Sequence, residues 1–238
     1  MTLQDRKVMT FDVVGTLIDF ETGILDYVRA RARDAGVALN DQAILEAYAA
    51  AEDRQHHQTP RLPFPAMLAP IYREMAATLG LPDTDDDVAG FRLSIPRWPA
   101  FADSIAALKR LRKNFHLVAM TNSDNWALSH FAATLELPFD DMVTAEMVGW
   151  NKPDPQVFAY VRGRLSKEGF GFDDILHVAQ SQYHDIAVAM ALGYHTCWIE
   201  RRKGKAGAGA TPVSGAYVKP HYHFASLQEL ADAVDQGQ

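Results

Sequence analysis

The chain has 238 residues, of which 48% are hydrophobic and 22% are charged, a composition typical of a globular protein with a sizeable core. The formal net charge is -7 and the basic residues are scattered, so we expect no nucleic acid as a partner. No apolar stretch approaches the roughly 20 residues needed to span a membrane, so we expect no membrane partner. With Cys197 as the single cysteine and no secretory leader, a cytoplasmic location is expected.

The first predicted element is a buried strand at Lys7–Val14, an apolar run that contains one acid, Asp12. The turn residues Gly15 and Thr16 follow it directly. From Thr22 to about Gly80 the apolar residues recur at helical spacing, which predicts an all-helical block. A carboxylate therefore stands at the carboxyl end of the first strand, just before a helical insertion.

After Pro99, strands and helices alternate along the chain. The predicted helices are Phe101–Lys113, Trp126–Leu135, Pro155–Leu165, His184–Leu192 and Leu227–Val234, and the predicted strands are His116–Thr121, Met142–Thr144, Ile175–Ala179 and His195–Glu200. Because parallel strands need crossover helices, this order predicts an α/β fold with a doubly wound parallel sheet. We expect a core domain formed by residues 1–18 and 100–238, and an inserted α-helical cap domain at residues 19–99.

Polar residues follow several of the predicted strands. Ligands of open α/β sheets bind beyond the carboxyl ends of the strands, so we expect these residues to share one cleft. They are Asp12, Thr121-Asn122, Asn151-Lys152 and the segment Gln180–Asp185. An ionised Asp12 is a suitable nucleophile, and the charge of Lys152 would lower the pKa of that carboxyl.

Four segments resemble, in their order, the motifs of the haloacid dehalogenase superfamily: Phe11–Leu17, Thr121-Asn122, Lys152–Pro155 and Gln180–Asp185. The helical insertion after the first motif is similar to that of the subgroup containing the L-2-haloacid dehalogenases and the phosphonoacetaldehyde hydrolases. The resemblance implies a Rossmann-like core and a cap that closes over a small carboxylate substrate. Related caps often pack into dimers, so it also allows a homodimer.

The resemblance implies roles for individual residues. Asp12 would attack the substrate and form a covalent aspartyl intermediate, Thr16 would position it, and Lys152 would keep it ionised. Asp185 would orient Lys152 or activate water, and the alternative is that it only caps the helix that follows. The residues expected to contact or surround the substrate are Val14, Tyr48, Glu52, Thr121, Asn122, Gln180, Ser181 and Gln182.

Two departures from related hydrolases narrow the reaction class. Val14 stands where the superfamily phosphatases carry a second Asp as general acid, and Gln180 and Ser181 stand where they carry an acid that holds Mg²⁺. We therefore predict that the enzyme uses no metal and no cofactor. There is no lysine between Lys7 and Lys109, so the Schiff base of phosphonoacetaldehyde hydrolase has no cap lysine to form it.

The predicted cap also differs from that of the dehalogenases. In those enzymes an arginine of the cap holds the departing halide. The corresponding position of this chain falls near Ala49 and Glu52, and Arg54 or Arg61 would be the nearby arginines to take its place. A carboxylate suits a departing ammonium better than a halide. We therefore expect displacement at C2 of either a 2-haloacid or a strained cyclic amino acid such as L-azetidine-2-carboxylate. A low-activity phosphatase and a non-catalytic binding protein are the alternatives.

Two histidine pairs, His56-His57 and His221-His223, resemble metal ligands at first sight. No acidic partner stands near either pair at ligand spacing. We therefore expect these four side chains to be solvated.

Overall fold

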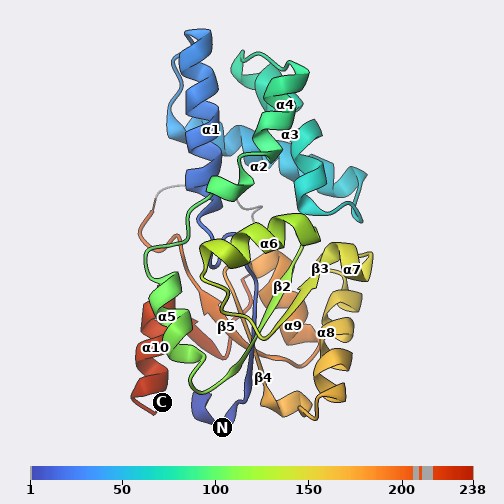
Figure 1. Cartoon of the computed structure of the whole chain (residues 1–238), viewed down its shortest axis with the longest axis vertical. Helices are drawn as coiled ribbons and strands as arrows, with labels where there is room; N and C mark the ends of the chain where they lie inside the picture. The colour runs from blue at the N-terminus through green and yellow to red at the C-terminus, as the bar shows by residue number, and fades with distance from the viewer. Residues whose placement is uncertain (1, 206–208, 211–216, 238) are drawn as a thin grey trace.

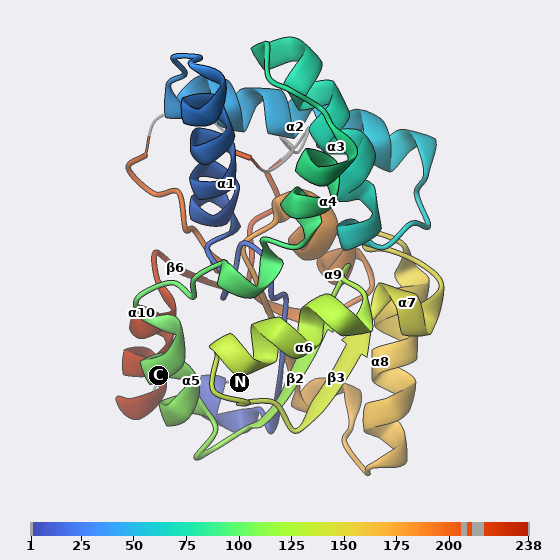
Figure 2. The same cartoon turned by 45° about the horizontal axis from the view of Figure 1, so that its top comes forward.

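The computed structural model describes residues 2–205, 209–210 and 217–237. It confirms the α/β fold class, because one parallel sheet carries helices on both faces (Figure 1). A group of helices lies above the carboxyl end of this sheet, as Figure 2 also shows from a second direction. None of the described helices combines the length and the apolar character that crossing a membrane requires.

The sheet has six strands in the order β3-β2-β1-β4-β5-β6, and all neighbouring pairs are parallel. The strands are β1 (Val8–Phe11), β2 (His116–Thr121), β3 (Asp141–Thr144), β4 (Ile175–Ala179), β5 (His195–Ile199) and β6 (Tyr222–Phe224). All five predicted strands are present at or near the predicted positions. The sixth, β6, was not predicted, because its three residues are only partly buried and form no apolar run.

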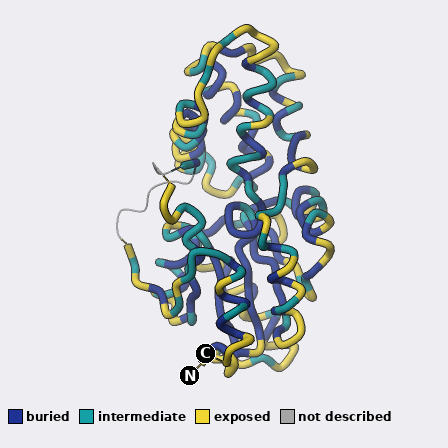
Figure 3. The backbone as a smooth tube through the Cα atoms, turned by 90° about the vertical axis from the view of Figure 1, so that its left-hand side faces the viewer, coloured by how far each residue is buried: buried dark blue, intermediate teal, exposed yellow. Residues whose placement is uncertain are grey.

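Two apolar cores lie on opposite faces of the sheet, since successive strand residues point in opposite directions. Met9 of β1 belongs to one core and its neighbour Val8 belongs to the other. The first core is covered by α5 (Ser104–Leu111), α6 (Asn125–Thr134) and α10 (Leu227–Asp235). The second is covered by α8 (Pro155–Lys167) and α9 (Ala187–Ala191), with the short α7 (Ala145–Val148) beside α8. Figure 3 shows the strands as a buried interior with exposed loops around it.

The predicted helical block is present, and we call residues 20–97 the helical insert. It contains α1 (Phe20–Ala35), α2 (Asp41–Gln58), α3 (Phe64–Leu79), α4 (Asp85–Arg92) and a 3-10 turn at Ile95–Arg97. Side chains preceding three of these helices accept hydrogen bonds from the first helical turn, which satisfies amide groups that have no partner inside the helix. They are Asp19, Asn40 and Thr84.

The two chain segments that join the insert to the sheet lie side by side. The Asp19 amide donates to the Pro99 carbonyl at 2.8 Å, and the Phe101 amide donates to the Leu17 carbonyl at 3.0 Å. The expected domain boundaries at 18/19 and 99/100 fall at this junction, and the division into two domains stays a prediction. The insert therefore begins and ends just beyond the carboxyl end of β1.

Candidate active site

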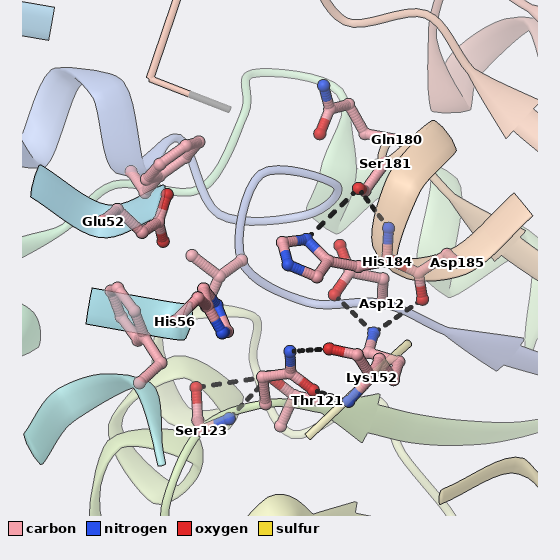
Figure 4. Close-up of a pocket in the computed structure, with 14 residues that line it drawn as sticks. Asp12, Glu52, His56, Thr121, Ser123, Lys152, Gln180, Ser181, His184 and Asp185 are labelled. Atoms are coloured by element: carbon pink, nitrogen blue, oxygen red, sulfur yellow. Dashed lines mark hydrogen bonds and ion pairs between the residues drawn. The ribbon is translucent and has the colours of Figure 1, made fainter. Parts of the chain in front are cut away.

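A cavity lies between the carboxyl edge of the sheet and the helical insert (Figure 4). The space within it, open solvent at the mouth included, is about 530 Å³. The sheet side and the insert both contribute side chains to its walls. The lining residues are Asp12, Val14, Phe20, Glu52, His56, Phe64, Thr121, Asn122, Ser123, Lys152, Gln180, Ser181, His184 and Asp185.

Asp12 follows β1 directly and is held from two sides. Thr16 Oγ1 donates to Asp12 Oδ2 at 2.6 Å, and Lys152 Nζ donates to Asp12 Oδ1 at 2.9 Å. The turn that brings Thr16 back to Asp12 passes through Gly15 at φ +89°, a conformation that side-chain-bearing residues rarely adopt. The carboxyl is 7% exposed and faces the cavity.

The pKa of Asp12 differs in direction from the sequence expectation. Burial raises it above its ordinary value, and the charge of Lys152 and the Thr16 hydroxyl oppose that rise only in part. Asp185, the second nearby carboxylate, raises it further. The expected lowering by Lys152 is therefore present but is outweighed by desolvation.

Lys152 uses all three of its N–H donors inside the protein. Its Nζ lies 2.9 Å from Asp12 Oδ1, 2.7 Å from Asp185 Oδ1 and 2.9 Å from the Met120 carbonyl. Burial alone would lower the pKa of this amine, but the charges of Asp12 and Asp185 outweigh burial and raise it. The ammonium therefore stays charged and joins the two carboxylates.

The side chain of Asn122 forms two hydrogen bonds with the backbone of Lys152. Its Oδ1 accepts from the Lys152 amide at 2.6 Å, and its Nδ2 donates to the Lys152 carbonyl at 2.9 Å. Asn122 was expected to contact the substrate. It does line the cavity, but its amide group is already engaged in holding the residue that bears the ammonium.

Asp185 receives two buried donors on one oxygen. Besides Lys152, His177 Nε2 lies 3.0 Å from Asp185 Oδ1, and His177 Nδ1 lies 2.9 Å from Thr10 Oγ1. Burial raises the pKa of Asp185, yet the charge of Lys152 and the His177 hydrogen bond outweigh it and bring the pKa to about 2. The reading of Asp185 as a helix cap is wrong, because Ser181 caps that turn by accepting from the His184 amide at 2.9 Å.

The segment after β4 meets the cavity with some of the predicted residues and not with others. Gln180 and Ser181 line it, and Thr16 Oγ1 accepts from the Gln180 amide at 2.8 Å. Gln182 does not line it, because the helical turn at Gln182–Ile186 directs its side chain elsewhere and its Oε1 accepts from the Val218 amide at 3.1 Å. The expected contact between Gln182 and substrate therefore finds no support in the geometry.

Helix α2 carries Glu52 and His56 into the cavity, one helical turn apart on the same face. Tyr48, one turn earlier, does not line the cavity. It is fully buried behind Glu52 and donates to Glu52 Oε1 at 3.3 Å. Burial raises the pKa of Glu52 to about 8, so the neutral acid predominates below that pH. The negative charge expected at Glu52 is therefore only partly developed near neutral pH.

Neither arginine considered as a halide ligand reaches the cavity. Arg54 pairs with Glu74, and the Arg61 guanidinium lies 3.6 Å from the centre of the Trp150 ring. Within the described part of the chain, the cavity wall contains no arginine.

The rings of His56 and His184 pack against each other in the cavity wall, with ring centres 5.0 Å apart. Burial lowers the pKa of both rings, that of His184 to about 3. The expectation that His56 is solvated holds only in part, because the residue is half-buried and lines the cavity. Its spacing of four residues from Glu52 is the sequence signal that places it on the same helical face.

Sequence reasoning also missed four other residues at or beside the site. Phe20 and Phe64 of the insert give no signal, because apolar residues on helices are common in any core. Ser123 directly follows Thr121-Asn122 and lines the same wall. His177 is the one polar residue in the apolar strand β4, and its full burial beside Asp185 explains its presence there.

The site residues do not fit a divalent metal ion. The ammonium of Lys152 already occupies the position between the two carboxylates, and the side chain of Val14 offers no oxygen as a further ligand. Over the described ranges, no group of three or more His, Cys, Asp or Glu side chains is suited to hold a metal.

Comparison with known proteins shows what the chain is similar to. A family model described as haloacid dehalogenase-like hydrolase matches residues 6–193. Haloacid dehalogenase-like hydrolase domain-containing protein 3 of Mus musculus is 25% identical over an alignment of 246 residues, covering 96% of this chain and 94% of that protein. The (S)-2-haloacid dehalogenase of Pseudomonas putida is 28% identical over 107 residues, 44% of this chain and 45% of that enzyme.

Solved structures show the same architecture. The L-2-haloacid dehalogenase from Xanthobacter autotrophicus with chloropropionic acid covalently bound matches with a TM-score of 0.73 at 17% identity, covering 97% of this chain and 98% of that one. At this identity the likeness concerns the fold alone.

Proposed function

The chain belongs to the haloacid dehalogenase-like hydrolase family, and from that premise we propose that it displaces a leaving group from C2 of a small 2-substituted carboxylic acid. The observation that carries the proposal is a buried carboxylate, Asp12, which faces a small cavity and is held at 2.9 Å by the Lys152 ammonium. The sequence relative named (S)-2-haloacid dehalogenase supports the substrate class.

In the proposed reaction an Asp12 oxygen attacks C2 of the substrate. The bond from C2 to the leaving group breaks, the electron pair departs with that group, and an aspartyl ester remains. Water then hydrolyses the ester and releases a 2-hydroxy acid. The substrate carboxylate would be held by neutral donors of the cavity wall, among them the hydroxyl of Ser123, which accepts from the Thr121 hydroxyl at 3.2 Å.

The residue at position 14 favours this reaction over phosphate ester hydrolysis. A valine neither protonates a leaving alcohol nor activates a water molecule, whereas a halide or a strained ring amine leaves C2 without a general acid at that position. The three N–H donors of Lys152 are saturated by protein groups, which keeps the amine out of Schiff-base chemistry.

Two leaving groups are the candidates, and they differ in the state of Glu52 that they need. A departing halide is favoured by the protonated acid, whose O–H group can donate to it. The ring ammonium of L-azetidine-2-carboxylate is favoured by the ionised acid, which balances its charge. Since the pKa of Glu52 is about 8, both states are accessible near neutral pH.

The test measures covalent chemistry at Asp12 with both substrates. The enzyme is incubated with 2-chloropropionate or with L-azetidine-2-carboxylate in water enriched in oxygen-18, with more enzyme than substrate. We expect one heavy oxygen in the peptide that contains Asp12, together with halide release or ring opening. Asp12→Asn should abolish both, whereas Asp86→Asn, an exposed carboxylate on α4, should change neither. An unlabelled Asp12 peptide after product has formed would refute the proposal.

A further inference from the structure

Hydrolysis of the Asp12 ester needs a group that accepts a proton from water, and the cavity contains few that are free to do so. Lys152 is charged and all its donors are engaged. Glu52 is a neutral acid below a pH of about 8. Asp185 has a buried Oδ2 without a partner among the described residues, but Lys152 and His177, which contact its Oδ1, hold its pKa at about 2 and make it a weak base.

His184, in contrast, is a neutral ring that takes part in no ion pair among the described residues. Its Nε2 atom is buried and has no hydrogen-bond partner among the residues that the structure describes. Figure 4 shows the ring inside the cavity, between the Asp12 side and the insert side. A buried polar atom without a partner is unusual in a native protein, and a bound water or ligand commonly supplies that partner.

The contacts of Ser181 are compatible with a tautomer of this ring in which Nε2 accepts a proton. Ser181 Oγ accepts from the His184 amide at 2.9 Å and lies 3.4 Å from His184 Nδ1. A hydroxyl oxygen has two lone pairs, so it can accept from the amide and from an Nδ1–H group at once. In that tautomer Nε2 carries the lone pair and points into the cavity.

His56 packs against the His184 ring from the side of the insert. It comes from α2 of the helical insert, whereas His184 comes from the sheet side, and the ring centres are 5.0 Å apart. Burial lowers the pKa of both rings, so neither carries a charge that would compete for the substrate carboxylate near neutral pH.

From these contacts we propose that His184 is a catalytic residue of the second half-reaction: its Nε2 binds the hydrolytic water and takes a proton from it, and His56 bounds the water site from the insert. This inference rests on the proposed ester intermediate. The water oxygen bonds to the ester carbonyl carbon of Asp12 as one water proton passes to Nε2. The tetrahedral carbon then releases the substrate oxygen, which takes the proton back from the imidazolium and leaves as a 2-hydroxy acid. Asp12 is left as a carboxylic acid and releases its remaining proton to solvent.

Burial, His56 and Lys152 lower the pKa of His184 to about 3, and the negative charge of Asp185 opposes this shift only in part. The imidazolium is therefore short-lived and readily returns its proton to the departing substrate oxygen. The attack of Asp12 on C2 involves no proton acceptor, so loss of His184 should affect the hydrolysis of the ester and leave its formation largely intact.

The test compares ester formation with ester decay. Wild-type enzyme, His184→Asn and His184→Gln are mixed with the active substrate, quenched with acid at successive times and analysed by intact mass. We expect both variants to form the Asp12 adduct at nearly the wild-type rate and to lose it at least about 100-fold more slowly, the contribution usual for a general base. His57→Ala, an exposed neighbour of His56 on the same helix, is the matched control and should decay like the wild type.

The outcomes separate this inference from the proposed function. If the wild type incorporates oxygen-18 into Asp12 and the adduct of either His184 variant decays at the wild-type rate, the role of His184 is refuted and the ester mechanism stands. If the wild type forms no adduct and no label enters Asp12, both proposals fail. Adduct formation itself reports that a variant is folded. A wild-type decay rate that is unchanged in D₂O would also argue against proton transfer to His184.

Discussion

At the scale of single residues, three buried charged groups meet at the floor of the cavity. Asp12, Lys152 and Asp185 are each no more than 7% exposed, and one ammonium faces two carboxylates. The two carboxyl groups divide this charge unequally, because the pKa of Asp185 falls to about 2 while that of Asp12 is raised. Asp185 therefore stays ionised beside the ammonium, whereas the ammonium stabilises the ionised form of Asp12 less.

His177 is a positioning residue behind Asp185. Removal of its donor by His177→Leu should loosen Asp185 and through it Lys152, lowering kcat/KM about 10- to 100-fold, as expected for loss of a hydrogen bond to a charged group. The pKa of Asp185 would rise from about 2, so activity should be lost at a higher pH on acidification. His177→Gln keeps a donor near the Nε2 position and should restore much of the activity and the acid limb. The measurement is the pH profile of kcat/KM, and equal acid limbs in the Leu and Gln variants would contradict this role.

Glu52 gives a prediction whose sign identifies the leaving group. Its pKa is about 8, so the protonated form dominates below that pH and the carboxylate above it. If a halide departs, kcat/KM should fall as the pH rises through about 8, because the carboxylate repels the developing anion. If a ring ammonium departs, kcat/KM should rise over the same interval. Glu52→Gln should remove this limb from the pH profile in either case, and a limb that survives in the variant would assign it to another group.

At the scale of secondary structure elements, the site depends on how α2 and α1 are held over the sheet. Tyr48, Glu52 and His56 occupy successive turns of one face of α2, so the rotation of this helix decides which of them meets the cavity. Helix α1 is held by close packing of Gly23 on Trp98, a fully buried ring near the junction of insert and sheet.

Gly23 therefore predicts a stability effect. A Cβ atom at this position would lie 2.4 Å from the Trp98 ring, closer than any real contact, so Gly23→Ala should force the ring or the helix to move. We expect a loss of about 1–3 kcal/mol in the free energy of unfolding, the usual cost of overpacking a core. Urea unfolding followed by circular dichroism measures it.

Gly163 in α8 is the matched control, because a Cβ atom there meets nothing within 4 Å. Gly163→Ala should stabilise the protein by about 0.5–1 kcal/mol through the higher helix propensity of alanine. Equal effects of the two substitutions would show that helix propensity, and not the contact with Trp98, decides the result.

At the scale of the whole molecule, the sequence predicted the α/β fold and the place of the insertion, since both depend on long, strongly periodic segments. It also predicted that Asp12, Lys152 and Asp185 meet, because strand ends of a parallel sheet share one edge. It failed where the outcome depends on packing between distant segments. The exclusion of Gln182 from the cavity follows from the geometry of a single turn, and the burial of His56 follows from the way α2 lies over the sheet.

The insert and the sheet are tied together around the cavity as well as at the chain junction. Asn151 Nδ2 donates to the carbonyls of Pro60 and Leu62 at 2.9 and 2.7 Å, and the Phe64 amide donates to the Asn122 carbonyl at 2.8 Å. These contacts shield the charged groups from water, which strengthens their interactions and raises the cost of burying each charge. The buried charges of the site should therefore lower the free energy of unfolding.

This cost of burial predicts stability changes of opposite sign at the two carboxylates. The folded-state pKa of Asp12 is raised, so its ionised form at neutral pH costs stability, and Asp12→Asn should increase the free energy of unfolding by about 0.5–2 kcal/mol while abolishing activity. The pKa of Asp185 is depressed to about 2, so its stabilising contribution is present above the unfolded-state value and is lost as the pH falls toward 2. Asp185→Asn should therefore lower the free energy of unfolding at neutral pH. Lys152 would then pair only with Asp12, whose pKa is raised by burial. Thermal and urea unfolding of both variants at pH 7 measure the difference. Destabilisation by Asp12→Asn would show that the Lys152 contact more than offsets the burial of the nucleophile.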